Sequence, residues 1–209
     1  MTGGTSGAGL ATVRFLAERG AEVITCGRDV AKGEAELSSL ADEIRKNINV
    51  WKLDLIDLSS VKEFADKVLE KWDKMDGLVN NAGIMLPSKT FVLIKDKKYD
   101  TQFMTNHVGH FYLTELLLPL LTKNGTGRIV NVSSVAHDRI SLGGKTFDGH
   151  IHFDDIHCRE RNYDDRQYHQ SKLANILHAR KLAHLYEKDG IYAFSAHPGT
   201  VKSNLILQS

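Results

Sequence analysis

Apolar residues fall into two alternating patterns along this chain. Spacings of three and four residues predict helices, and short apolar runs between polar or glycine residues predict buried strands. Helices are expected at 10–17, 29–46, 61–72, 100–121 and 165–188, and strands at 22–26, 49–53, 77–80, 128–133 and 191–196. Because strands and helices alternate, the sequence predicts an α/β fold with a doubly wound parallel sheet and helices on both faces.

The stretch 135–166 interrupts this alternation. It is polar and rich in His, Asp and Gly, so we expect an irregular excursion from the sheet. No internal repeat or low-complexity linker divides the chain. A length of 209 residues is also ordinary for one folding unit, which predicts a single domain over 1–209.

A glycine-rich turn stands at the start of the chain, with the sequence Thr2-Gly3-Gly4-Thr5-Ser6-Gly7-Ala8-Gly9. Gly3 and Gly7 let the backbone bend tightly and approach a ligand, and Gly9 lets the next helix pack close to the sheet. The N-terminus of that helix would then face an anion. The turn is typical of a site for a dinucleotide pyrophosphate, and a plain surface turn of this composition is also common.

Composition argues against several other classes of function. Basic residues number 27 and acidic residues 26, mixed along the chain for a formal net charge of +1, which argues against nucleic acid or an acidic membrane surface as a partner. Cys26 and Cys158 do not resemble a disulfide framework and fit a reducing compartment. We find no apolar run of membrane-spanning length and no signal-peptide pattern.

Tyr168 and Lys172 are the main candidates for acid–base chemistry. Four residues apart on an expected helix, they lie on one face, about 40° apart around its axis. Free tyrosine has a pKa of about 10, and lowering it to 7 takes about 4 kcal/mol, much of which a nearby cation can supply. Tyr168 is therefore a candidate general acid or base. The same spacing also occurs by chance on many solvated helix faces.

Three further polar residues are candidates for the site. Ser133 and Ser134 end an expected strand at the sheet edge where doubly wound folds bind ligands, and a hydroxyl there could orient a carbonyl oxygen. Serines also simply end strands. Asn106 interrupts an expected helix among weak helix formers, a place where a polar group makes a kink or holds water.

Together these segments resemble the short-chain dehydrogenase/reductase family, and most of all its retinol-dehydrogenase-like and WW-domain-oxidoreductase-like branch. The resemblance runs from Thr2 to Leu205, rests on seven ordered motifs, and implies a Rossmann fold. In chain order, the motifs are the glycine-rich turn, Asp54-Leu55, Asn80-Asn81-Ala82-Gly83, Asn106-His107-Val108-Gly109-His110-Phe111, Val132-Ser133-Ser134, Tyr168-His169-Gln170-Ser171-Lys172 and His197-Pro198-Gly199.

The resemblance implies a tetrad of Asn106, Ser134, Tyr168 and Lys172. Tyr168 would exchange a proton with the substrate oxygen, and Ser134 would hold that oxygen. Lys172 would lower the tyrosine pKa and bind the nicotinamide ribose, while Asn106 would position a water linked to Lys172. Besides Tyr168 and Lys172, the implied cofactor contacts are Gly3, Thr5, Ser6, Gly7, Gly9, Arg28, Asp54, Leu55, Asn80, Ala82, Gly83, Pro198, Gly199 and Ser203.

The end of the expected strand at 22–26, which corresponds to the second strand of the family's fold, bears on the choice between NAD and NADP. NAD-selective sites usually place an acid there for the ribose 2′-hydroxyl, but this chain has Gly27 followed by Arg28. A 2′-phosphate carries nearly two negative charges and pairs well with a guanidinium. We therefore predict NADP(H), the other interpretation being that Arg28 is a solvated loop residue.

A metal site is not expected. His150, His152, His157 and Cys158 lie close together in the sequence, but their spacing matches no common zinc pattern and acidic residues surround them.

The predicted function is an oxidoreductase that transfers a hydride between NADP(H) and a lipophilic alcohol or carbonyl, with retinoids favoured by resemblance. An epimerase of the extended branch ranks lower, because Asn80–Gly83 and Asn106–Phe111 favour the reductases. The resemblance also implies a homodimer through the helices that contain Leu116 and Leu177. The expected location is the cytoplasm or the cytosolic face of an intracellular membrane.

The alternative interpretation is an inactive fragment or a partner-binding product. Only Met1 precedes the glycine-rich turn, and the chain ends twelve residues after His197. By resemblance, we therefore expect the sheet to lack its central first strand and its C-terminal strand. Five buried apolar residues of a strand contribute roughly 7 to 15 kcal/mol, and a whole domain has only about 5 to 15 kcal/mol to lose.

Overall fold

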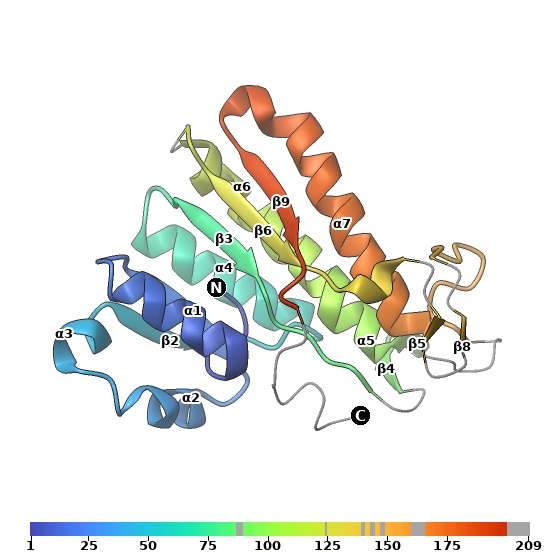
Figure 1. The fold of residues 1–209 in the computed structure, drawn as a ribbon, viewed down its shortest axis with the longest axis horizontal. Coiled ribbons are helices and arrows are strands. Elements are labelled where there is room, and N and C mark those ends of the chain that lie inside the picture. Colours follow the sequence, from blue (N-terminus) through green and yellow to red (C-terminus); the bar gives the residue numbers. More distant parts are fainter. Residues whose placement is uncertain are drawn as a thin grey trace.

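The computed structural model describes residues 1–86, 90–123, 125–138, 141–142, 145–146, 149–159 and 166–199. Two groups of parallel strands form its centre (Figure 1). In one group, β1 (Val23–Gly27) pairs with β2 (Ile48–Lys52). In the other, β6 (Arg128–Val132) lies between β3 (Gly77–Asn80) and β9 (Tyr192–Ala196). The predicted parallel sheet is confirmed, and β9 is its edge within the described residues.

Met1 and Thr2 lie between the two groups of strands. The Met1 amino group donates to the Ile24 carbonyl at 2.7 Å, and Thr2 forms a parallel bridge with Cys26. On the other side, the Thr2 N–H donates to the Val79 carbonyl at 3.0 Å. The position of the expected first strand is thus taken by two residues, which connect β1 to β3 through main-chain hydrogen bonds.

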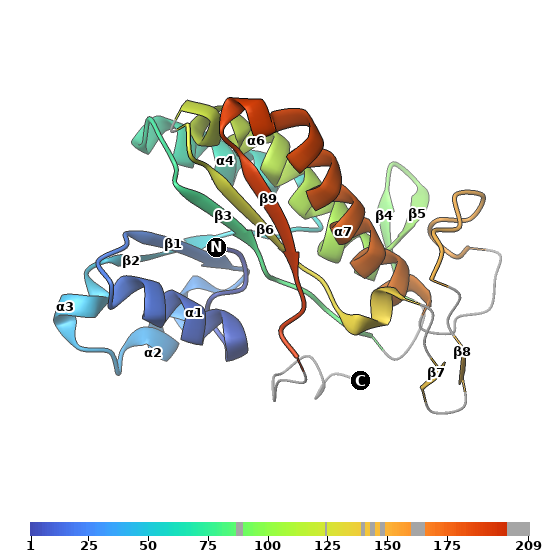
Figure 2. The ribbon, with the colours of Figure 1, turned by 45° about the horizontal axis from the view of Figure 1, so that its top comes forward.

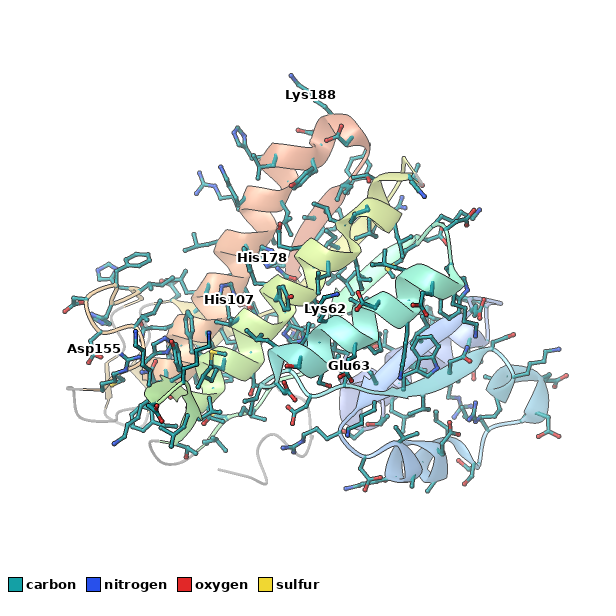
Figure 3. The ribbon with its side chains drawn as sticks, turned by 180° about the vertical axis from the view of Figure 1, so that it is seen from behind. Lys62, Glu63, His107, Asp155, His178 and Lys188 are labelled. Atoms are coloured by element: carbon teal, nitrogen blue, oxygen red, sulfur yellow. The ribbon has the colours of Figure 1, made fainter. Side chains whose placement is uncertain are left out.

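Helices cover both faces of the sheet, as the sequence predicts (Figure 2). On one side of β1 and β2 are α1 (Gly7–Ala17), α2 (Val30–Leu37) and the short α3 (Asp42–Arg45). The other face is covered by α4 (Leu58–Lys71), α6 (Gly109–Lys123) and α7 (Arg166–Tyr186), which Figure 3 shows from behind. Within the described residues, no helix has both the length and the apolar character that crossing a membrane requires.

The main core lies between the sheet and these three helices. The predicted apolar stripe of α4 is buried, with Val61 and Phe64 facing the sheet and the ring of Phe64 at 5.9 Å from that of Trp51. On α6, Leu113, Leu117 and Leu121 are almost completely buried. Removing these side chains from water fixes both helices against the strands that carry the site.

One local prediction was wrong, and one element was missed. The helix expected at 29–46 is divided into α2 and α3, because the Ser38 hydroxyl and N–H both donate to the Ala35 carbonyl and end α2 locally. The structure also contains an antiparallel hairpin that was not predicted, formed by β4 (Phe91–Ile94) and β5 (Lys97–Asp100).

The helix expected at 100–121 has three parts: α5 (Thr101–Phe103), the π-helical segment η1 (Met104–Val108) and α6. Asp100 caps its start by accepting from the Phe103 N–H at 2.6 Å. The π-helical segment contains Asn106, where the sequence predicted an interruption. Such segments insert one extra residue into a helical turn and change the direction of the side chains around it.

The excursion expected at 135–166 is largely irregular where it is described. It contains the 3₁₀ turn η2 (Val135–His137) and the two-residue strands β7 (Ser141–Leu142) and β8 (Lys145–Thr146). Another 3₁₀ turn, η3 (Glu187–Asp189), precedes β9. Cys158, expected in a polar loop, is 2% exposed, and within the described residues neither cysteine forms a disulfide.

Candidate active site

A cavity of about 830 Å³ lies at the carboxyl ends of the parallel strands, the edge at which doubly wound folds bind ligands. Its volume is within the range of small-molecule and cofactor sites. The cavity brings together thirteen of the residues expected from the sequence: Gly3, Thr5, Ser6, Gly7, Gly9, Arg28, Asp54, Leu55, Ala82, Gly83, Tyr168, Lys172 and Pro198. Asn80, Asn106, Ser134 and Gly199 lie outside its lining, and Ser203 lies outside the described residues.

The glycine-rich turn forms one wall of this cavity. Gly3 has φ +62°, and a Cβ at this position would lie 2.9 Å from the Ala82 Cα. A Cβ on Gly9 would lie 2.1 Å from the Gly3 carbonyl oxygen, so α1 packs too closely here for any side chain. Ser6, the N-cap of α1, makes no side-chain hydrogen bond to the helix. The first-turn N–H groups therefore have no side-chain cap, as in helix termini that bind anions.

Charged residues follow β1 at the next part of the cavity wall. Arg28, Asp29 and Lys32 all line the cavity and are exposed. The Asp29 carboxylate accepts from the Lys32 N–H at 2.9 Å and so caps α2. This acid is engaged locally, while the guanidinium of Arg28 is next to it on the rim.

Asp54 and Leu55 follow β2 and line the same cavity. The Asp54 side chain accepts from the Ile56 N–H at 3.1 Å, which holds the turn after the strand. Leu55 is packed against the beginning of α6, where a Cβ on Gly109 would lie 2.2 Å from the Leu55 carbonyl. The glycine of the Asn106–Phe111 motif thus allows the helix to approach this wall.

The segment after β3 separates into structural and cavity-lining residues. The Asn80 side chain is buried and donates to Thr114 Oγ1 at 2.9 Å and to Asn131 Oδ1 at 2.8 Å, so it joins the sheet to α6. Asn81 donates to the main-chain carbonyls of Thr2 and Gly3. Only Ala82 and Gly83 of the predicted cofactor contacts in this motif line the cavity.

Asn106 is completely buried and holds the next part of this segment. Its Oδ1 accepts from the Ile84 N–H at 2.8 Å, and its Nδ2 donates to the Ile84 carbonyl at 2.9 Å. The same Nδ2 donates to Ser171 Oγ on α7 at 3.1 Å. A Cβ on Gly83 would be 3.2 Å from Lys172 Nζ and 3.4 Å from Asn106 Oδ1, so these two groups flank one glycine.

The two serines after β6 differ in their partners. Ser133 Oγ is buried and donates to the Lys172 carbonyl at 2.7 Å, which joins the strand to α7. The half-buried Ser134 hydroxyl interacts with the Tyr168 side chain and caps η2 by accepting from the Ala136 N–H at 3.2 Å. Ser134 rather than Ser133 is therefore the hydroxyl beside the phenol.

Tyr168 and Lys172 lie on α7 and are 6% and 4% exposed. The Lys172 Nζ is 5.5 Å from the Tyr168 ring centroid and donates to the Val132 carbonyl at 3.2 Å. Burial raises the pKa of Tyr168, an effect that the Ser134 hydrogen bond opposes. Burial also lowers the pKa of Lys172 to about 8. The expected lowering of the tyrosine pKa is not seen, because desolvation of the phenol is the larger effect.

The sequence did not indicate the part that several other residues have in the site. Thr2 and Lys32 line the cavity, and so do the apolar side chains of Ile84 and Leu86. Gln102, 1% exposed, accepts from the Leu86 N–H at 2.8 Å. Gln102 and Asn106 are four residues apart on the helix and hold alternate residues of the extended segment, a spacing that could have indicated this pairing.

The residues considered for a metal site have other contacts. His157 Nδ1 lies 3.3 Å from the Asp100 N, and its ring packs edge-on against Tyr99. Among the described residues, no three metal-ligating side chains are grouped.

Comparison with known proteins gives the same assignment along the whole chain. Residues 1–145 match the family described as short chain dehydrogenase. Retinol dehydrogenase 12 of Mus musculus is 41% identical over all of this chain, and retinol dehydrogenase 13 of Homo sapiens is 37% identical over 98% of it. The chain spans 63% and 59% of the lengths of these two relatives.

A solved structure of an uncharacterized protein from Mycobacterium paratuberculosis is also similar. It superimposes with a TM-score of 0.77 at 41% sequence identity, over 99% of this chain and 69% of that one. The family match, the relatives and the shared fold lead to one conclusion. The chain belongs to the short-chain dehydrogenase/reductase family and, within it, to the retinol-dehydrogenase-like branch.

Proposed function

We propose that this chain forms the cofactor and proton-transfer site of an oxidoreductase that interconverts a lipophilic alcohol and its carbonyl with NADP(H). The observation that carries the proposal is that Tyr168 and Lys172 share one cavity with the glycine-rich turn. A dinucleotide at the turn and a substrate oxygen at Tyr168 would then meet in one cavity. When bound, the cofactor supplies or accepts the hydride.

The residues around the turn fit a dinucleotide with a 2′-phosphate. The uncapped first turn of α1 offers N–H groups to the pyrophosphate. Arg28 and Lys32 on the rim provide two positive charges for the 2′-phosphate, with Arg28 able to make paired hydrogen bonds. Asp29, the nearby acid that could otherwise favour NAD, caps α2.

Tyr168 would be the proton donor when a carbonyl is reduced. Its hydroxyl proton goes to the carbonyl oxygen as the hydride reaches the carbonyl carbon, which leaves an alcohol and a tyrosinate. Burial favours the protonated phenol that this step needs. In the opposite direction, the tyrosinate would take the proton of the alcohol, with Ser134 and the Lys172 ammonium stabilising the charge.

The substrate is proposed to be lipophilic because part of the cavity wall is apolar. Ile84 and Leu86 line it, and Asn106 and Gln102 fix their main chain. Both relatives are named for retinol, a lipophilic alcohol. Retinal is therefore the first substrate to test.

The proposal is tested by turnover of retinal with NADPH and NADH, combined with thermal melting with and without NADPH. We expect a cooperative transition that NADPH raises, and a higher kcat/KM with NADPH than with NADH. A clear preference for NADH would contradict the cofactor assignment. The absence of a transition, or of any shift with either nucleotide, would favour the inactive fragment.

Replacing Tyr168 separates proton transfer from cofactor binding. Tyr168→Phe is expected to lower kcat at least 100-fold, within the range for general acid–base catalysis, while the NADPH-dependent melting shift is retained. Tyr192→Phe changes an exposed tyrosine on β9 and is the control, with kcat unchanged. Retained turnover in Tyr168→Phe would remove Tyr168 from the role of proton donor.

A further inference from the structure

His110 is buried and contacts two residues of the site, Thr2 and Asn106, although the proposed chemistry does not use it. It is 1% exposed and lies four residues after Asn106, at the start of α6. One ring nitrogen contacts a residue 108 positions earlier in the sequence, and the other a residue four positions earlier. Nε2 is 2.8 Å from Thr2 Oγ1, and Nδ1 is 3.0 Å from the main-chain carbonyl oxygen of Asn106.

The partners of the ring fix the position of its proton. A carbonyl oxygen can only accept, so Nδ1 carries the hydrogen and donates to Asn106. In the neutral ring, Nε2 is then the acceptor, and the Thr2 hydroxyl must donate to it.

The hydroxyl of Thr2 supports the same assignment. Thr2 Oγ1 accepts from the Asn81 N–H at 2.9 Å and from the Ala82 N–H at 3.0 Å, which occupies both of its lone pairs. Its single proton is left for His110. Burial lowers the pKa of His110 to about 3, so the neutral ring is the form present near neutral pH.

The π-helical segment makes the carbonyl of Asn106 part of this arrangement. In an α-helix, that carbonyl would accept from the main-chain N–H four residues later. In η1 the ladder is shifted, since the Gly109 N–H bonds to Met104, five residues earlier. Next to this shift, the Asn106 carbonyl receives a hydrogen bond from the side chain of His110.

These contacts close a ring of hydrogen bonds around the site. The N–H groups of Asn81 and Ala82 donate to Thr2, Thr2 donates to His110, and His110 donates to Asn106. The Asn106 side chain then returns to Ile84, two residues after Ala82. The ring thus includes the first residue of the glycine-rich turn and the asparagine that, with Lys172, flanks Gly83.

We propose that His110 is a positioning residue, which holds Asn106 at a fixed distance from the glycine-rich turn and so keeps the cofactor-binding and proton-transfer parts of the site in register. This proposal rests on the proposed function. Without His110, the turn and the π-helical segment would still be present, but Asn106 would lose its hydrogen-bonded link to Thr2.

The kinetic test compares His110→Leu, which removes both hydrogen bonds, with His110→Gln, which can keep a donor and an acceptor. We expect His110→Leu to lower kcat at least tenfold while the Kd of NADPH, from the melting shift, stays within threefold. His110→Gln should recover part of the loss. Wild-type kcat in His110→Leu would overturn the proposal.

Thr114→Val is the matched control, because it also removes two buried hydrogen bonds made by a side chain of α6. The Thr114 hydroxyl donates to the His110 carbonyl and accepts from Asn80, without contact to Asn106. It should lower the melting temperature and keep kcat within twofold of the wild type. An equal loss of kcat in Thr114→Val and His110→Leu would indicate general destabilisation and refute a specific role for His110.

A second measurement does not depend on activity and is made on the wild-type chain. In ¹⁵N-histidine NMR of the wild-type chain, with the signals assigned by their loss in His110→Gln, His110 should be protonated at Nδ1 and unchanged from pH 8 to pH 5. Protonation at Nε2, or titration within this range, would refute the proposed hydrogen-bond ring. Absence of turnover in the wild type would refute the proposed function alone, since the NMR result stands independently.

Discussion

Asn106 and Ile84 are joined through both ends of one side-chain amide, which accepts from the Ile84 N–H at 2.8 Å and donates to its carbonyl at 2.9 Å. The Asn106 side chain thereby makes the two hydrogen bonds to Ile84 that the main chain of a neighbouring strand would make. Because it is completely buried, both polar ends of its side chain depend on these partners.

Asn106→Asp preserves the shape of this side chain but replaces its donor. The carboxylate can still accept from the Ile84 N–H, but its second oxygen faces the Ile84 carbonyl, so a buried acceptor meets another acceptor. We expect a loss of about 1 to 3 kcal/mol in the free energy of unfolding, measured by urea titration, and a lower kcat. Asn49→Asp on β2, half-exposed and away from the cavity, should change neither by much. A urea midpoint for Asn106→Asp equal to that of the wild type would contradict this interpretation.

Arg28→Ala should change the preference between cofactors. Loss of charge-assisted hydrogen bonds to a phosphate, at about 1.5 to 3 kcal/mol, corresponds to roughly a 10- to 100-fold lower kcat/KM with NADPH. The value for NADH should stay within threefold. Arg19→Ala, which removes a guanidinium stacked on Phe15 outside the cavity, is the control. Equal losses with both cofactors would show that Arg28 does not contact the 2′-phosphate.

The burial of Lys172 predicts that the free energy of unfolding depends on pH in the alkaline range. Its pKa is about 8 in the folded chain and near 10.5 when exposed, so the unfolded chain binds more protons between these values. The free energy of unfolding therefore gains a contribution that rises with pH from about 8 to 10.5, with a slope approaching 1.4 kcal/mol per pH unit, roughly. Relative to Lys172→Met, the wild type should gain stability over this range in urea titrations.

A matched control for this experiment is Lys181→Met, which changes an exposed lysine on the same helix. The difference in stability between wild type and Lys181→Met should be constant from pH 7 to pH 10. A constant difference for Lys172→Met as well would mean that the Lys172 ammonium is not desolvated by the fold.

The burial of His178 predicts that the folded chain loses stability at acidic pH. Its ring lies between α6 and α7 with that of His107, at 5.9 Å between centroids (Figure 3). In the described part of the chain, its Nε2 is buried without a hydrogen-bond partner. Burial lowers the pKa of His178 to about 4, below the ordinary value of 6.5. The unfolded chain therefore binds more protons between these values, and stability falls as the pH is lowered from 6.5 to 4.

His178→Leu should remove this part of the acid sensitivity. At pH 8 its free energy of unfolding should be within about 1 kcal/mol of the wild type, because Nε2 is already unsatisfied and Asn131 Nδ2, which loses His178 Nδ1 at 3.3 Å, still donates to the Asn175 carbonyl. At pH 5 the variant should be the more stable of the two in urea titration. His184→Leu, exposed on α7, should show no such pH-dependent difference. A His178→Leu curve parallel to that of the wild type would contradict the expected protonation.

The elements that build the cavity could be predicted because their signals are local. Helical spacing placed Tyr168 and Lys172 on one face of α7, and glycines marked the turn before α1. The hairpin of β4 and β5 was missed because its two-residue turn is Lys95-Asp96, both at positive φ. Turns of this kind usually contain asparagine and glycine, so the ordinary sequence signal was absent.

The ring of hydrogen bonds around His110 could not be predicted in the same way. The contact between Thr2 and His110 joins residues 108 positions apart, and neither side chain indicates its partner. The direction of the shift in the tyrosine pKa could not be predicted either, because it depends on how completely the fold buries the phenol. Sequence spacing placed the two groups on one face, and only the packed structure decides which electrostatic effect is larger.

The narrow connection at Met1 and Thr2 has a consequence for the cooperativity of unfolding. Main-chain hydrogen bonds link β1 to β3 through these two residues, and within the described chain one hydrophobic core, which includes Cys26 and Leu78, spans both groups of strands. These two parts of the domain can still differ in their rates of amide hydrogen exchange, because few main-chain hydrogen bonds join them. Because the cavity is lined from both parts, a ligand bound there would couple their opening and make the domain unfold as one unit.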